Sequence, residues 1–597
     1  MANVNQEVTI VKPQPGVDPD LRALKIEMDD AKLGADPLEH LQEKLGNSLY
    51  SQFLWSSSFD GSSTHILSTA RDALPEVEFN KILSVMQNDP AVTSVHLLHK
   101  HPDIVQELVA AKIEAAEYDS SWYWPVAERL PKSDYKAPKP IKIAQADSGV
   151  SLQPCLVGGF NPADSMSFFF PANKRKGKGV ICWGQGAPFF ISHGTSTGGL
   201  MVGQPTDGMN LHGMTLRDVV ELVPCRIADS VVLNPPDLER LAECINWAVS
   251  EGIKVINVSL GAIAFQGDPA LTALTRAVEN AYKKGVIICA AAGQIAPGMI
   301  WPGVYSLKGW LVACGPSNAS NAPSAQSIWV AFPNGYVTIG APGENMPQAG
   351  WKGGICASDE PQLARGDGSS YSAAFTSSIA ALWWARNYDA LSKMNPRDIV
   401  PLFRHTIQNT CTPWNGNYYK AKFSPGILNP NKAINAMVPP KDLNINSSGM
   451  FHVERVPGGT YRNVTLHAHG SGSIHVLDPV LVEGKLTLIS ESSATISMSG
   501  TIICRELEIK IKSSALIEAD DLEYYDKCTV NISHAGTLRA YIAAEGPMTG
   551  SVKGPDFWNG STLRAWIFWR NGRKSVSISK DWMSTIDISN NWGGRWA

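Results

Sequence analysis

This sequence of 597 residues has few charged side chains, no excess of either charge and no long apolar run. Charged residues make up 18% of it, and 51 Lys and Arg against 55 Asp and Glu leave a formal net charge of −4. That balance gives no indication of binding to nucleic acid or to an anionic membrane. Because no stretch reaches the roughly 18 consecutive apolar residues of a transmembrane helix, we expect no membrane-spanning segment.

Two further absences concern location and metal binding. The first residues, MANVNQEVTIVKPQPG, lack a basic stretch followed by an apolar one. We therefore expect no secretory signal, and a protein that is either cytoplasmic or exported by a non-standard route. The 10 cysteines are scattered and form no CxxC pair, which argues against a metal-binding knuckle. Most of them are expected to be reduced, buried small hydrophobic residues, although export would leave room for a disulfide or two.

The length exceeds what one hydrophobic core can hold, so we expect about two to four domains. Residues 1–135 are predicted to be an N-terminal extension with a polar start and a helix and a strand within 79–98. The extension ends in PKSDYKAPKPIK, whose prolines and lysines are typical of an exposed linker.

Residues 136–440 alternate helix patterns with strand patterns. LERLAECINWAVSEG precedes the apolar run VINVSL, and LTALTRAVENAYKKG precedes VIICAAA. Each pair is an amphipathic helix closed by glycine and followed by a buried strand. This alternation predicts an α/β fold with a doubly wound, mostly parallel sheet and helices on both faces. Active sites of such sheets lie at the carboxyl ends of the strands.

Residues 441–597 lose the helix patterns, and alternating strands separated by Ser and Gly replace them. A short pattern recurs there at steps of 21 residues: SSATI from Ser492, SSALI from Ser513 and, more loosely, HAGTL from His534. A fixed period near 20 with short strands in each unit predicts an all-β repeat domain, a small β-solenoid. The tryptophans near the end of the chain are expected to form a core or a cap, with a binding surface as the alternative.

Three residues of the middle region stand where catalysis could use them. Asp147 directly follows the apolar run IKIAQA, at the predicted carboxyl edge of the sheet. His193 precedes a glycine and a run of small residues, and Ser370 lies at the start of a long predicted helix. Backbone N–H groups at a helix start favour a developing oxyanion. Taken singly, each residue has an ordinary structural explanation: a turn cap, a core histidine and an N-cap serine.

Taken together, these residues resemble the subtilase family of serine peptidases. ADSGV, HGTSTGGLM and GSSYSAAFTSSIAAL are similar to the family's Asp, His and Ser motifs and occur in the family's order. VINVSLGA, VIICAAAGQ and TIGAPGE are similar to its substrate-binding edge, its oxyanion segment and the turn before its serine. The resemblance covers about 300 of the 597 residues. It implies a subtilisin-like fold and a serine endopeptidase that works through an acyl-enzyme.

The resemblance also implies roles for single residues. Asp147, His193 and Ser370 would be catalytic, Gln294 would be the oxyanion donor, and Ser259, Leu260, Gly261 and Ile300 would bind substrate. The family usually has Asn where this chain has Gln294, so the amide donor is kept on an arm one methylene longer. Ile300 would lie near the floor of the S1 pocket, which predicts a small or medium uncharged P1 side chain. No cofactor is implied; structural calcium is frequent in the family, but no acidic loop with ligand spacing is present, and a metal site stays open.

The flanking regions suggest further roles. NDPAVTSVHLL, residues 88–98, is similar to the end of a subtilase prodomain, which would be cut from the enzyme near 115–140; an unrelated N-terminal domain is the alternative. The expected partner is a protein or peptide substrate, and residues 441–597 would add a module that docks a partner or a surface.

Two other functions compete with the peptidase. An esterase of the α/β-hydrolase type would need a Gly-x-Ser-x-Gly elbow and a histidine after the serine. The segment around Ser370 lacks the final glycine, and His405, which follows it, lies in a predicted helix. A binding protein on a decayed peptidase scaffold is the second alternative: the retained Asp147, His193 and Ser370 argue against it, and Gln294 keeps it open.

Overall fold

The structure is a computed structural model, and it places two compact units, residues 1–437 and residues 438–597. The residues described are 9–11, 19–28, 43–45, 55–58, 64–68, 76–99, 134–181, 193–206, 211–263, 269–293, 300–324, 336–352, 360–415, 424–449, 452–457, 459–477, 480–544, 546–553, 561–569, 576–580 and 584–589.

The N-terminal extension contains a sheet and a helix. The helix and strand predicted within 79–98 are α2 (Glu76–Gln87) and β5 (Val92–His99), which are joined by a turn in which Asp89 accepts the backbone N–H of Ala91 at 2.9 Å. In the described part of the extension, β5 belongs to a five-stranded sheet in the order β1-β5-β2-β4-β3. The other strands are β1 (Thr9–Val11), β2 (Pro19–Met28), β3 (Trp55–Ser58) and β4 (Thr64–Ser68).

A larger sheet forms the centre of the first unit. Counting only described residues, it has nine strands in the order β17-β18-β14-β13-β11-β9-β6-β8-β7, and every neighbouring pair except β17 and β18 is parallel. The strands are β6 (Ile141–Asp147), β7 (Met166–Ser167), β8 (Val220–Arg226), β9 (Val255–Val258), β11 (Ile287–Ala291), β13 (Val312–Ser317), β14 (Ile339–Pro342), β17 (Thr412–Pro413) and β18 (Gly426–Ile427). The predicted parallel sheet is therefore present.

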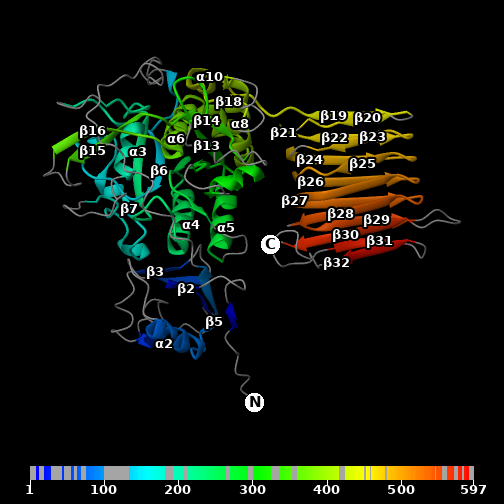
Figure 1. Ribbon diagram of the computed structural model, residues 1–597, viewed down its shortest axis with the longest axis horizontal. Coiled ribbons are helices and arrows are strands. Elements are labelled where there is room, and N and C mark those ends of the chain that lie inside the picture. Colours follow the sequence, from blue (N-terminus) through cyan, green and yellow to red (C-terminus); the bar gives the residue numbers. More distant parts are fainter. Residues whose placement is uncertain are drawn as a thin grey trace. The chain divides into compact units, whose positions relative to one another are not determined.

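Helices pack against this sheet in two pairs (Figure 1). One pair is α3 (His193–Val202) with α6 (Ser369–Arg386), and the other is α4 (Pro235–Ser250) with α5 (Pro269–Lys283). Almost every residue of α6 is buried, because its small side chains let the helix lie closely on β9, β11 and β13. Further helices of this unit are α7 (Tyr388–Leu391), α8 (Pro396–Thr410) and α10 (Pro430–Ile434).

Short pairs of strands complete the first unit. β10 (Ala262–Ile263) pairs with β12 (Ile300–Trp301), and β15 (Met346–Lys352) pairs with β16 (Glu360–Gly366), both antiparallel. The second hairpin contacts α3. Short 3₁₀ turns lie at Pro154–Leu156, Pro162–Asp164, Ala172–Lys174 and Gly303–Lys308.

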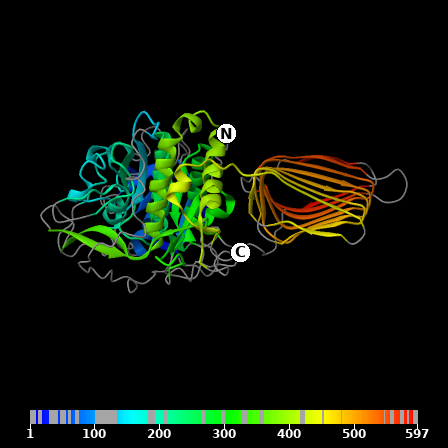
Figure 2. The same cartoon turned by 90° about the horizontal axis from the view of Figure 1, so that it is seen from above.

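The second unit is all-β in its described residues, as predicted (Figures 1 and 2). Its strands pair in parallel with strands about 20 to 28 residues away, as in Leu466–Leu488, Leu488–Ile509 and Ile509–Val530, and these side chains are buried. The strands are β19 (Leu443–Ser448), β20 (Val453–Arg455), β21 (Gly459–Tyr461), β22 (Val464–His469), β23 (Ser473–Val476), β24 (Val480–Ser490), β25 (Thr495–Met498), β26 (Ile502–Lys512), β27 (Leu516–Ser533), β28 (Thr537–Ala544), β29 (Met548–Lys553), β30 (Thr562–Trp569), β31 (Val576–Lys580) and β32 (Thr585–Ser589).

Candidate active site

Asp147 is the last residue of β6 and is fully buried. Its Oδ1 accepts the backbone N–H of Ser148 at 2.7 Å, and its Oδ2 accepts the hydroxyl of Thr197 at 3.1 Å. A buried carboxylate is costly unless such donors satisfy its oxygens. Both oxygens of the buried Asp147 side chain therefore have hydrogen-bond donors at the carboxyl end of the sheet.

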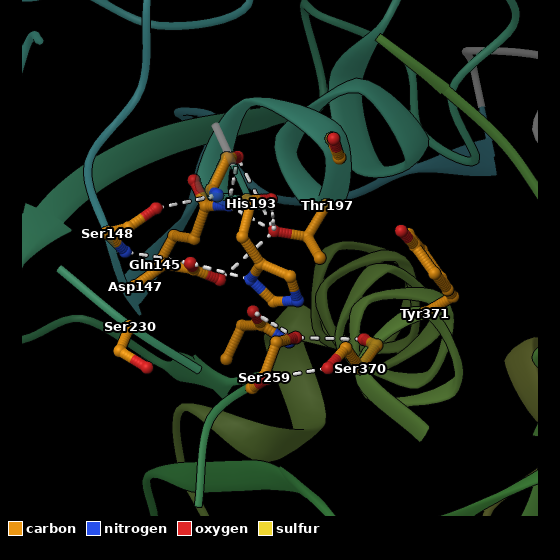
Figure 3. Close-up of polar contacts among 12 residues, drawn as sticks. Gln145, Asp147, Ser148, His193, Thr197, Ser230, Ser259, Ser370 and Tyr371 are labelled. Atoms are coloured by element: carbon orange, nitrogen blue, oxygen red, sulfur yellow. Dashed lines mark hydrogen bonds and ion pairs between the residues drawn. The ribbon is translucent and has the colours of Figure 1, made fainter. Parts of the chain in front are cut away.

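His193 is the first residue of α3, and its ring meets that carboxylate. Nδ1 of His193 lies 2.8 Å from Oδ1 of Asp147. Since a carboxylate can only accept, the shared hydrogen lies on Nδ1; in the tautomer that carries a hydrogen on this nitrogen alone, Nε2 is the acceptor. Figure 3 shows one edge of the imidazole toward Asp147 and the opposite edge toward the side of the site that holds Ser259 and Ser370.

The start of α3 is held by side chains that sequence reasoning missed. Nε2 of Gln145, two residues before Asp147, donates to the carbonyl of Gly194 and to the hydroxyl of Thr197, each at 2.7 Å. A Cβ at Gly194 would lie 2.2 Å from the carbonyl oxygen of Gly149, so only glycine lets the helix start this close to the sheet. Two features of the sequence could have pointed to these side chains. Gln145 is a polar residue inside the apolar run IKIAQA, and Thr197 lies one helical turn after His193.

Ser370 is the second residue of α6 and lies across the site from Asp147 (Figure 3). Its hydroxyl donates to the backbone carbonyl of Ser259 at 2.7 Å, and the hydroxyl of Ser259 donates to the carbonyl of Ser370 at 2.8 Å. The N-cap of α6 is Gly368, so Ser370 is not an N-cap serine. The hydroxyl of Ser369 accepts the backbone N–H of Gly293 at 3.1 Å, which ties the segment after β11 to α6.

The predicted substrate-binding edge is only partly open. Ser259, Leu260 and Gly261 follow β9 directly, as expected. The backbone N–H of Gly261, however, donates to the carbonyl of Val231 at 3.1 Å, and its carbonyl accepts the N–H of Leu233 at 2.8 Å. We predicted that the backbone of Gly261 pairs with a bound peptide. In the structure, both its N–H and its carbonyl already form hydrogen bonds within the chain. Gln294, the expected oxyanion donor, lies outside the described residues.

Ile300 lies between two glycine-containing segments. It belongs to β12, which pairs with β10 through Ile263. A Cβ at Gly261 would lie 2.4 Å from Cγ2 of Ile300, and a Cβ at Gly293 would lie 2.4 Å from its Cγ1. The two glycines thus leave space that the Ile300 side chain occupies.

Burial raises the pKa of one tyrosine beside the site and of a buried cysteine in the same unit. Burial, together with the carboxylates of Asp367 and Asp147, raises the pKa of Tyr371, whose hydroxyl donates to Oε1 of Gln348 on β15. Eight cysteines fall among the described residues and none forms a disulfide, as expected for most of them. Burial raises the pKa of the Cys155 thiol to about 12, which keeps it protonated.

Two further possibilities for the described part of the chain are a metal-binding cluster and a membrane-spanning helix. No group of three or more His, Cys, Asp or Glu residues there could hold a metal ion. No helix there is long and apolar enough to cross a membrane.

The chain is similar to known peptidases. A curated relative, the minor extracellular protease Epr of Bacillus subtilis (strain 168), is 26% identical over 212 residues, which are 35% of this chain and 27% of the relative. The chain thus spans about a quarter of that relative's length. Among solved structures, fervidolysin from Fervidobacterium pennivorans is 14% identical, with a TM-score of 0.45, over 75% of this chain and 66% of its own.

Two further solved structures resemble this chain over about half its length. The patellamide maturation protease PatA is 22% identical, with a TM-score of 0.36, over 50% of this chain and 97% of its own. MycP1 with its N-terminal propeptide removed is 20% identical, with a TM-score of 0.37, over 51% of this chain and 94% of its own. The model of the subtilase family matches residues 139–433. Residues 139–433 of this chain are therefore a subtilase-family domain.

Proposed function

We propose that this domain is a serine endopeptidase that hydrolyses peptide bonds through Asp147, His193 and Ser370. The observation that carries the proposal is the 2.8 Å contact between Nδ1 of His193 and the buried carboxylate of Asp147, with Ser370 at the N-terminus of α6 on the same side of the sheet. A buried carboxylate that fixes the tautomer of a histidine beside a serine is the arrangement that activates a hydroxyl for attack.

The chemistry follows from the donors and acceptors. Nε2 of His193 takes the hydroxyl proton as Oγ of Ser370 attacks the scissile carbonyl, and the carbonyl becomes a tetrahedral oxyanion. His193 then passes the proton to the leaving amine, and an acyl group stays on Ser370. Water, activated by the same nitrogen, attacks the ester and releases the acid. Asp147 keeps the ring oriented and stabilises the imidazolium throughout, without being protonated itself.

The oxyanion would be stabilised by two groups. The first N–H groups of α6, among them that of Ser370, have no partner within the helix, and the positive end of its dipole lies beside them. We propose the Gln294 side-chain amide as the second donor. The loss of one such donor lowers turnover about 10²–10³-fold, a magnitude measured in subtilisin, so its longer arm matters for the rate.

The P1 preference follows from Ile300. The side chain fills the space beside Gly261 and Gly293, and we propose that it limits the depth of the P1 pocket there. We propose that the enzyme accepts Gly or Ala at P1 and discriminates against large aromatic residues. This narrows the small or medium preference expected from the sequence.

The N-terminal extension is proposed to be a prodomain. β2 and β4 contact α4, and β5 contacts α5, so the extension packs directly on the subtilase-family domain. The test is the mass of the protein isolated in active form. A fragment that begins near 115–140 supports the proposal, and an intact N terminus in active enzyme contradicts it.

We propose that residues 441–597 are a β-solenoid that docks a partner or a surface. Ser492, Ser513 and His534, which are 21 residues apart, all have positive φ, at 67°, 60° and 55°. Equivalent corners at equal spacing are what a coil repeated along an axis requires.

Cleavage assays on the full chain test the peptidase. Wild-type protein is expected to cleave casein, while Ser370→Ala, which removes only the hydroxyl, is expected to be inactive and equally stable to heat. Cleavage that survives in Ser370→Ala would contradict the proposal. No cleavage by either protein would favour the alternative, a binding protein on a peptidase scaffold.

A further inference from the structure

The segment from Ser230 to Leu233 lies where an extended peptide would pair with the edge after β9. Backbone groups of alternate residues in a strand point to the same side, so Ser259 and Gly261 share one edge. At Gly261, the N–H donates to Val231 and the carbonyl accepts from Leu233 in a parallel bridge centred on Val232. An amide N–H has one hydrogen, so Gly261 cannot also donate to a peptide.

Ser259, the other residue whose backbone faces this edge, lies next to the reacting serine. The carbonyl of Ser259 accepts the Ser370 hydroxyl, so a peptide residue opposite Ser259 lies at the scissile bond. For a peptide antiparallel to this strand, the residue opposite Gly261 is two positions further toward the N terminus. If the residue opposite Ser259 is P1, the blocked position is P3.

The segment is anchored at its start. Asp229, directly before it, forms an ion pair with Arg226, with Nη2 and Oδ1 2.6 Å apart. The hydroxyl of Ser230 accepts the N–H of Val232 at 3.2 Å. The guanidinium of Arg226 lies 4.5 Å from the ring centre of Phe169, which fixes that side chain as well.

The end of the segment is anchored too. Leu233 is fully buried, and α4 begins at Pro235, two residues later. Asp237 accepts the backbone N–H of Asn234 at 3.0 Å and pairs with Arg240 at 2.5 Å. Pro235 and Pro236 hold the chain in the conformation of a helix start. Because both of its ends are anchored, we treat the segment Ser230–Leu233 as a fixed part of the site and not as a movable loop.

We propose that Ser230–Leu233 permanently occupies the position of substrate residue P3, so that the enzyme recognises the non-primed side through P1 and P2 only. This inference rests on the proposed peptidase function and defines its substrate class: peptides with as few as two residues before the scissile bond are full substrates. Main-chain pairing normally supplies affinity to an added strand, and here that contribution ends at P2.

A nested peptide series tests the inference. The peptides share Ala at P1 and the same primed residues and carry one to five residues before the scissile bond; kcat/KM is measured by mass spectrometry, with Ser370→Ala as the blank. We expect a rise when P2 is added and a change of less than about twofold when P3, P4 and P5 follow. A tenfold rise on adding P3 or P4 would overturn the inference while leaving the peptidase intact. If no peptide is hydrolysed in a Ser370-dependent way, the proposed function fails and takes this inference with it.

A second measurement asks whether the segment moves. An alanyl diphenyl phosphonate carrying residues P2 to P4 is coupled to Ser370 of the full chain, and hydrogen exchange is compared with that of the free protein. The amides of 229–234 are expected to keep the same protection. Loss of protection there would show that the peptide displaces the segment, which contradicts permanent occupation.

Discussion

The hydroxyl of Ser370 donates its hydrogen to the backbone carbonyl of Ser259, 2.7 Å away. The Ser259 hydroxyl returns a bond to the carbonyl of Ser370 at 2.8 Å, so residues 111 positions apart tie the start of α6 to the end of β9. For attack, the Ser370 hydroxyl has to leave this acceptor and turn toward Nε2 of His193. We propose that this step begins with a rotation of the Ser370 side chain away from the Ser259 carbonyl.

Thr197 is expected to position the acid and the histidine together. Its hydroxyl donates to Oδ2 of Asp147 at 3.1 Å and accepts from Gln145 at 2.7 Å. Thr197→Val removes a hydrogen bond to a charged group, worth about 1.5–3 kcal/mol, and we expect kcat to fall at least tenfold with KM within about twofold. Steady-state kinetics on a peptide check this. Thr197→Ser keeps the hydroxyl and should restore most of kcat; equal losses in both variants would argue against a role for the hydroxyl.

Ile300 is expected to set the P1 preference. Ile300→Gly empties the space beside Gly261 and Gly293. A pocket that gains several carbon atoms of room changes discrimination by about tenfold or more, so the ratio of kcat/KM for Phe over Ala at P1 should rise at least tenfold. Ile300→Val removes one methylene and should move the ratio far less. An unchanged ratio in Ile300→Gly would place the pocket elsewhere.

The corner at Ser513 offers a test of the repeat. Its φ of 60° is in the left-handed region, which costs a non-glycine residue about 1 kcal/mol. Ser513→Gly is therefore expected to raise the free energy of unfolding by several tenths of a kcal/mol, measured by urea denaturation. Ser514, its neighbour, is not at positive φ, and Ser514→Gly should lower stability because glycine adds freedom to the unfolded chain. The opposite order of the two variants would contradict this account of the corner.

Asp521 should make the stability of the second unit depend on pH. Burial raises the pKa of its carboxyl to about 6, with Glu523 and Asp520 adding to the effect. The unfolded value is about 3.9, so between these values the folded state binds more protons than the unfolded state. Its contribution to stability is therefore complete below about pH 4 and is lost as pH rises through about 6.

The matching variant is Asp521→Asn, which keeps an acceptor for the hydroxyl of Thr501 now 2.6 Å from Oδ2. We expect its melting temperature to exceed that of the wild type at pH 8 and the difference to shrink toward pH 4. Asp520→Asn, at an exposed neighbour, removes only one of the two carboxylates that add to the shift, so it should change the pH dependence far less than Asp521→Asn. Parallel pH curves for wild type and Asp521→Asn would refute the assignment.

Sequence patterns were enough to place Asp147, because a residue after a buried parallel strand must lie at the sheet's carboxyl edge. The pairing of His193 with Asp147 followed only from the family resemblance, and the structure brings the two side chains together. Gln145 and Thr197 could not be assigned, because their bonds depend on how closely α3 lies on β6. The β-bridge between Val232 and Gly261 could not be predicted from the sequence either, because it depends on the path of the chain before α4 begins at Pro235.

The most direct test of the account is covalent labelling of the nucleophile. Full-length protein is treated with a fluorophosphonate, digested and analysed by mass spectrometry. We predict one adduct, on Ser370, that is absent in Ser370→Ala and forms at least a hundredfold more slowly in His193→Ala, because the histidine activates the hydroxyl. A folded wild-type protein without an adduct on Ser370, or labelling at an equal rate in His193→Ala, would contradict the proposed active site.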